Sequence, residues 1–207
     1  INARPDSPLG YNNLGMVQCE LGHASTAIET LRSAIYQMPT ESMLWNSLAT
    51  VLAESGRAEE SIQFYQEASR LEPGFSRPHH NLGFAYSHLG RLEEALECYD
   101  QALERAKDPV EIIEGQHSRG ICLIGMGQLE EGWREYEVRN NPRFRACVHY
   151  MLKAPIWRGE MLEGKRILVT GEQGLGDEFM FANILPDLAR AVGSNGKLQI
   201  AVDKRLV

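Results

Sequence analysis

Cysteine is scarce in this 207-residue sequence, and the four that occur are scattered: Cys19, Cys98, Cys122 and Cys147. No two of them form a CxxC pair, which argues against a disulfide framework and against a zinc site built from paired thiolates. We therefore expect buried, reduced thiols, as is usual in a cytosolic protein. Apolar runs of membrane-spanning length are also lacking, and the start of the sequence shows no secretory signal pattern. These absences predict a cytoplasmic protein that does not contact a membrane.

A metal-binding pattern and a basic surface are lacking as well. The histidines at positions 79, 80, 88 and 117 do not combine i, i+4 spacing with a carboxylate on one helical face, so we expect no metal and no other cofactor. Residues 1–140 carry 11 Lys and Arg against 21 Asp and Glu, a net charge of −10, and residues 141–207 carry 10 against 7, a net charge of +3. An acidic segment repels phosphate groups, which argues against nucleic-acid binding.

A period of 34 residues dominates the first two thirds of the chain. Three residue types recur at this spacing, and the positions are Leu14, Leu48 and Leu82, then Gly22, Gly56 and Gly90, then Ala34, Ala68 and Ala102. This period, with its mixture of small and large apolar positions, is typical of the tetratricopeptide repeat, a helix–turn–helix unit, and the resemblance covers residues 8–140. It predicts a mostly α-helical, right-handed superhelical solenoid over residues 1–140. The alternative is an irregular helical bundle.

Small residues in this pattern have a physical purpose. Gly15, Ala49 and Gly83 fall where the two helices of a unit cross closely, so that only a small side chain fits. The glycines that follow each first helix are expected at positive φ, which glycine adopts without a Cβ clash. Three repeats are clear, and a divergent fourth unit follows after a slip of three residues, with Gly127 in register and Arg119 in place of the core leucine.

The pattern changes after residue 140. Residues 141–163 are predicted to be a connector, and residues 164–207 a different segment. Arg166–Thr170 and Leu198–Val202 are short apolar, β-branched runs that predict two strands, and residues 178–192 predict an amphipathic helix between them. This order predicts a partial, Rossmann-like β-α-β segment. Because the first residue is Ile1 rather than Met, we expect the chain to be a piece of a longer protein.

Several local strings in this part resemble the heptosyltransferase-like glycosyltransferases that follow tetratricopeptide repeats. The strings are Leu129–Glu137, Pro155–Gly159, Glu172–Asp177 and Leu185-Pro186. The resemblance implies that Asp177 is a general base for an acceptor hydroxyl and that Gly174 and Gly176 shape its loop. The alternative is that Asp177 only caps a helix. Phe179 stands where a dinucleotide fingerprint needs a third glycine, so NAD binding is disfavoured.

First-helix side chains are expected to line a concave groove that binds a protein or peptide. Asn13, Ser47 and Asn81 precede the repeat leucine, where an asparagine can offer a donor and an acceptor to a peptide backbone. The alternatives are solvent-exposed amides and, for the apolar members, ordinary core positions. The full set of predicted groove residues is Asn12, Asn13, Met16, Asn46, Ser47, His80, Asn81, Phe84 and His117.

Three functional hypotheses follow from these features. The first is a protein-binding module at the front of a glycosyltransferase-like protein, without catalysis by residues 1–207 themselves, since two strands and one helix cannot bury both faces of a sheet. The second is a sugar-transferring enzyme whose catalytic domain is incomplete here. The third is a scaffold that associates with itself through the open ends of the solenoid.

Overall fold

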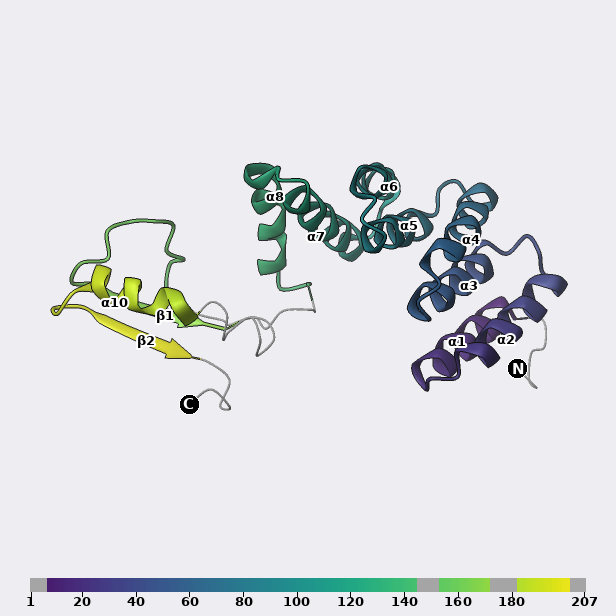
Figure 1. Ribbon diagram of the computed structural model, residues 1–207, viewed down its shortest axis with the longest axis horizontal. Coiled ribbons are helices and arrows are strands. Elements are labelled where there is room, and N and C mark those ends of the chain that lie inside the picture. Colours follow the sequence, from purple (N-terminus) through teal and green to yellow (C-terminus); the bar gives the residue numbers. More distant parts are fainter. Residues whose placement is uncertain (1–6, 145–152, 172–181, 202–207) are drawn as a thin grey trace. The chain divides into compact units, whose positions relative to one another are not determined.

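The computed structural model describes residues 7–144, 153–171 and 182–201 (Figure 1). The chain divides into two units, Ile1–Val138 and Arg139–Val207, and each is described by itself. Gly174, Gly176 and Asp177 lie outside the described residues, as does Cys147. No helix among the described residues is both long enough and apolar enough to cross a membrane.

Helices in the first unit follow one another as hairpins, as the 34-residue period predicts (Figure 1). We call the first helix of each pair the A helix and the second the B helix. The pairs are α1 (Pro8–Glu20) with α2 (Ala24–Gln37), α3 (Ser42–Glu54) with α4 (Ala58–Leu71), α5 (Ser76–His88) with α6 (Leu92–Arg105), and α7 (Pro109–Gly125) with α8 (Leu129–Tyr136). A short 3-10 helix, η1 (Glu137–Asn140), follows α8. Each B helix also packs against the next A helix, so the pairs form one continuous stack.

Glycines close every A helix at the expected conformation. Gly22, Gly56, Gly90 and Gly127 have φ values of 81°, 78°, 73° and 80°. Among the described residues, no residue other than glycine has positive φ. The predicted register of the repeats, including the slip before the fourth unit, is therefore confirmed.

Close helix crossings explain the small residues inside the A helices. A Cβ atom on Gly15 would lie 2.8 Å from Cγ of Leu31, and one on Gly83 would lie 2.7 Å from Cε1 of Tyr99. Both distances are shorter than any ordinary carbon contact, so these positions accept only glycine unless the Leu31 or Tyr99 side chain shifts. Leu31 and Tyr99 are buried in the two core clusters that fill the space between layers.

The fourth pair differs from the others in length and in packing. Asp108 caps α7 by accepting a hydrogen bond from the Val110 backbone N–H at 2.7 Å, and Pro109 occupies the first turn. With 17 residues, α7 is four residues longer than the 13-residue A helices before it, and the connection that precedes it is one residue shorter, which together give the three extra residues. Gly120 and Gly132 bring the backbones together, since a Cβ on Gly120 would lie 3.0 Å from the Gly132 carbonyl oxygen.

Arg119 takes the place of a core leucine without leaving an unpaired buried charge. Its Nε donates to Asp100 Oδ1 at 2.6 Å, and its Nη1 contacts Glu131 at 3.3 Å and Glu135. These three carboxylates raise its pKa despite the opposing effect of burial, so the guanidinium stays charged. Ionic contacts therefore replace the apolar contact that Leu48 and Leu82 make in the earlier pairs.

The second unit contains a small parallel sheet. Strands β1 (Arg166–Thr170) and β2 (Lys197–Ala201) pair in parallel, with Ile167 opposite Leu198. Between them lie the 3-10 helix η2 (Ala182–Ile184) and helix α10 (Leu185–Val192). Leu188 and Val192 of α10 pack on one face of the sheet, whereas Leu168 and Ile200 on the other face stay exposed.

These strands bear out part of the sequence prediction. The first strand has the expected bounds, and the second begins one residue earlier than expected, at Lys197. Two short strands and one helix occur in many α/β folds, so they do not identify a Rossmann-like domain, and this part of the predicted fold class is not supported. The start of the helix expected over residues 178–192 lies outside the described residues, and Ala182–Ile184 form a 3-10 turn, so the described α-helix covers only Leu185–Val192.

Candidate partner-binding surface

Polar side chains connect neighbouring A helices directly. Asn12 of α1 accepts a hydrogen bond from the Ser47 hydroxyl of α3. The Asn81 amide of α5 donates to Asn46 Oδ1 of α3 at 3.1 Å, and His80 Nε2 lies 3.0 Å from Ser118 Oγ of α7. We call these three contacts the polar ladder.

The ladder repeats because the sequence repeats. In each contact, the first residue occupies one position of an A helix, and its partner occupies the next position of the following A helix. The separations along the chain are 35, 35 and 38 residues, so the last one carries the same three-residue slip as the fourth pair. Asn46 and Ser47 are buried although they are polar. Because buried polar groups need partners, the ladder satisfies groups that the stacking of repeats removes from water.

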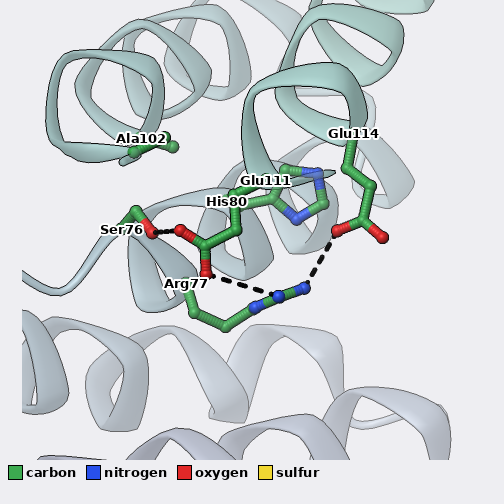
Figure 2. Close-up of a pocket in the computed structure, with 7 residues that line it drawn as sticks. Ser76, Arg77, His80, Ala102, Glu111 and Glu114 are labelled. Atoms are coloured by element: carbon green, nitrogen blue, oxygen red, sulfur yellow. Dashed lines mark hydrogen bonds and ion pairs between the residues drawn. The ribbon is translucent and has the colours of Figure 1, made fainter. Parts of the chain in front are cut away.

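A charged network extends the ladder between α5 and α7 (Figure 2). Ser76 Oγ donates to Glu111 Oε2 at 2.6 Å, and Arg77 Nη1 donates to Glu114 Oε2 at 3.0 Å. Arg77 Nη2 also lies 3.4 Å from Glu111 Oε1, so this arginine bridges two carboxylates of α7. Residues of α5, α6 and α7, with Ala106 just after α6, line a partly open pocket with a cavity volume of about 10 Å³, which is room for about one water molecule. The network holds two A helices together.

His80 at the centre of this region is held neutral. Burial is the main cause that lowers its pKa below the ordinary histidine value, and it outweighs the opposing effects of the Asn81 side chain and of Glu114, while the nearby Arg77 guanidinium lowers the pKa further. The pKa of His79 is also lowered, again mainly by burial. Neutral imidazole can accept a hydrogen bond on one ring nitrogen, which suits the short contact between His80 and the Ser118 hydroxyl.

Apolar side chains flank the ladder and remain exposed. Phe84 of α5 is 52% exposed and Ile121 of α7 is 50% exposed, and they occupy equivalent positions of their helices. Both follow a ladder residue of their own helix, His80 or Ser118, by three or four positions, so they lie on the same helical face. Leu9 and Met43, one turn before the ladder in α1 and α3, are exposed as well. We call Leu9, Met43, Phe84 and Ile121 the apolar stripe.

Most of the predicted groove residues lie together on this face. Asn12, Asn46, Ser47, His80 and Asn81 form the ladder, and Phe84 belongs to the stripe, with its ring 4.1 Å from that of His88. Asn13 is exposed and accepts a hydrogen bond from the Asn12 amide. Met16 packs against the first core cluster rather than lying open. His117 stacks on Tyr136 with ring centroids 5.0 Å apart.

Several residues of this surface were missed at the level of sequence. Leu9 and Met43 follow the same 34-residue period as the predicted residues, so the period could have found them. Arg77 and Glu114 occupy the repeat position of Leu9 and Met43, so the period marks them too, but their charge does not indicate that they pair with each other across the repeats.

Catalytic and metal chemistry finds no support in the part of the chain that is described. No group of three or more potential ligands comes together there. Burial raises the pKa of Cys98 to about 11, and burial together with a hydrogen bond to Glu54 raises the pKa of Cys19 to about 11. Both thiols are therefore protonated at neutral pH and are poor nucleophiles. The general-base role implied for Asp177 stays a prediction, since that residue lies outside the described ranges.

Comparison with protein families supports the repeat. Residues 76–109 match the tetratricopeptide repeat model, and residues 10–72 match the model of the bacterial transcriptional activator domain. Together with the helix pairs, these matches define a helical repeat protein of the tetratricopeptide type. Neither match reaches residues 164–207, and neither is to a glycosyltransferase, so that part of the sequence resemblance is not supported.

One curated protein is similar to this chain in sequence, and solved structures are similar to it in fold. Protein FlbA of Caulobacter vibrioides is 42% identical over 204 residues, which are 99% of this chain. The chain spans only 34% of the length of FlbA. TTC0263, a tetratricopeptide protein of Thermus thermophilus, superposes with a TM-score of 0.60 at 20% identity, over 68% of this chain and 77% of its own. MamA superposes with a TM-score of 0.56 at 21% identity, over 66% of this chain and 78% of its own. At this identity the two structures establish the fold alone.

Proposed function

We propose that the repeats of residues 7–140 bind a protein partner as an extended segment along the exposed face of the A helices. The observation that carries the proposal is the apolar stripe. Phe84 and Ile121 remain half-exposed at equivalent positions, although nearly all other large apolar residues of α5 and α7 are wholly or partly buried. Surfaces that bind partners are typically marked by large apolar or aromatic side chains that remain exposed to solvent.

The ladder makes a different contribution from the one expected at sequence level. Its amides and hydroxyls bond to one another across repeats, so they set the spacing of the A helices. Part of their hydrogen-bonding capacity therefore serves the stack, and less of it is left for a peptide backbone. Affinity in this proposal comes from apolar burial on the stripe, at about 25 cal/mol per Å² of area removed from water.

Exposed carboxylates at the ends of the first two A helices narrow the class of partner. Glu20 and Glu54 are exposed at the ends of α1 and α3, and Glu54 accepts a hydrogen bond from the Cys19 thiol at 3.3 Å. A segment that combines apolar residues with a lysine or arginine complements this face better than an acidic one. We propose an apolar, basic segment as the ligand of the groove.

Selection from a random peptide library tests this function. Peptides that bind the immobilised chain are enriched on phage, and their affinities are then measured by fluorescence polarisation. We expect enriched sequences with apolar and basic residues, and a loss of at least about tenfold in affinity for Phe84→Asp and Ile121→Asp, as at an interface hot spot. Tyr36→Asp is the control, because Tyr36 is 90% exposed and lies on the B helix α2 rather than on an A helix. Enriched peptides that bind both stripe variants as tightly as the wild type would contradict the proposal.

A role in regulation is a second candidate function. It is favoured by the match of residues 10–72 to the bacterial transcriptional activator domain. The net charge of −10 on residues 1–140 disfavours direct contact with DNA, so in this setting the repeats would contact a protein of the regulatory machinery. An electrophoretic mobility shift with random duplex DNA tests the charge argument, and we expect no shift at physiological salt.

A further inference from the structure

Both ends of the helical stack expose a face that is covered everywhere inside it. At the end formed by α8, Trp133 is 50% exposed and Leu129 is exposed beside it. At the end formed by α1, Val17 is 50% exposed. Each of these residues has equivalents in the inner repeats, and those equivalents show what the face is built to contact.

The residues of α6 that are equivalent to Leu129 and Trp133 lie on the face that contacts the next A helix, α7. Leu92 and Leu96 stand in α6 where Leu129 and Trp133 stand in α8, and both are half-buried against the second core cluster. The Leu92 carbonyl oxygen accepts a hydrogen bond from the Cys122 thiol of α7 at 3.2 Å. A Cβ on Gly125 of α7 would lie 3.3 Å from Leu92 Cδ1. The apolar face of α8 therefore has the pattern that receives an A helix.

The residues equivalent to Val17 in later A helices pack against the preceding B helix. They are Val51, Ala85 and Cys122, with exposed fractions of 0%, 1% and 2%. Val51 belongs to the cluster that contains Ile28 and Leu31 of α2, and Ala85 to the one that contains Tyr65 of α4. The face of α1 around Val17 therefore has the pattern that receives a B helix.

We infer that a second copy of this chain covers these faces, with α8 of one copy packed against α1 of the next. The two exposed faces are the two complementary halves of an interface that the chain already forms between α2 and α3, α4 and α5, and α6 and α7. Because the halves differ, the contact is head-to-tail and each dimer keeps one free face of each kind. The exposed face of the A helices would then continue from α7 of one copy to α1 of the next.

Complementation between two single variants tests the inference. Val17→Asp blocks the α1 face and Trp133→Asp blocks the α8 face, since a carboxylate would be buried without a partner. In sedimentation-velocity runs at rising concentration, the wild type should associate beyond a dimer, and each variant alone should need at least about a tenfold higher concentration to associate. A 1:1 mixture should form a dimer and nothing larger, because the intact α8 face of V17D meets the intact α1 face of W133D.

Controls keep the test decisive. Tyr36→Asp replaces an exposed aromatic residue on neither face and should associate as the wild type does. Far-UV circular dichroism confirms folding, and Leu129→Asp replaces Trp133→Asp if the latter unfolds. A wild type that stays monomeric at every concentration, as it would if another segment of the same chain covers Trp133, overturns the inference. So does a mixture of variants that stays monomeric. Neither result bears on the peptide affinities that test the groove.

Discussion

The side-chain amide of Asn81 donates a hydrogen bond to Oδ1 of Asn46 at 3.1 Å, which joins α5 to α3 across 35 positions of the chain. Asn46 is only 9% exposed, so water cannot replace this donor freely. A side chain of one repeat thus provides the hydrogen-bond partner for a polar group of the neighbouring repeat. The same arrangement recurs at Asn12 with Ser47 and at His80 with Ser118. The A helices are held in register by polar contacts as well as by the apolar core.

Removing the donor of this pair should destabilise the stack. We expect Asn81→Ala to lower the free energy of unfolding by about 1–3 kcal/mol, since it leaves the buried Asn46 oxygen without a partner. Asn13→Ala is the matched control, because Asn13 is exposed and bonds only within its own helix, and it should change stability by less than about 0.5 kcal/mol. Urea unfolding followed by circular dichroism measures both. Equal effects of the two substitutions would show that the ladder does not stabilise the stack.

The turn between α3 and α4 gives a second prediction. Gly56 has φ of 78° with no atom near the position of a Cβ, so Gly56→Ala introduces backbone strain without a side-chain clash. We expect a loss of about 1–2 kcal/mol in the free energy of unfolding. Gly74→Ala is the control, since that glycine also has open space but lacks positive φ, and it should lose less than about 0.5 kcal/mol. A neutral Gly56→Ala in thermal unfolding would argue against a strained position.

Local periodicity explains why so much of the first unit could be predicted. A glycine at positive φ and a small residue at a helix crossing are requirements of each hairpin by itself, and they recur in the sequence every 34 residues. Gly22, Gly56 and Gly90 therefore identify the turns, and Gly15 and Gly83 the crossings. The strand at Arg166–Thr170 was predictable for a similar reason, because a short β-branched run between turn residues is a local signal.

Contacts between repeats could not be predicted in the same way. The pairing of Asn12 with Ser47 depends on how far each hairpin is rotated against the next, which the period does not encode. Arg119 was recognised as an anomaly, but its partners Asp100 and Glu135 are ordinary surface carboxylates in the sequence. The tail shows the limit of local signals, since two strands were located correctly while the domain to which they belong was not established.

A larger residue at a crossing should test the packing of a hairpin. A Cβ on Gly83 would lie 2.7 Å from Cε1 of Tyr99, which is itself buried, and 3.1 Å from the Ala95 carbonyl oxygen. We expect Gly83→Val to lower the free energy of unfolding by about 1–3 kcal/mol through overpacking. Gly83→Ala, which adds the Cβ alone, should lower the free energy of unfolding by less than Gly83→Val does. An unchanged urea midpoint for Gly83→Val would mean that α5 and α6 can separate without cost.

Stability should fall as the solution is made mildly acidic, and His80 should contribute to the fall. Burial lowers the pKa of His80 in the folded state below the ordinary value of about 6.5 that the unfolded chain retains. Below this pH the unfolded state binds more protons than the folded state, so stability is complete above about pH 6.5 and declines as the pH drops toward the folded pKa.

His80→Gln keeps a side chain that can bond to Ser118 but cannot titrate. We expect its stability to decline less than that of the wild type between about pH 7.5 and pH 5.5, a window in which ordinary carboxylates stay largely ionised. His88→Gln is the control, since His88 is exposed. Parallel pH profiles for the wild type and His80→Gln would show that His80 takes up its proton as readily in the folded stack as in the unfolded chain, and that the contact with Ser118 does not depend on a neutral ring.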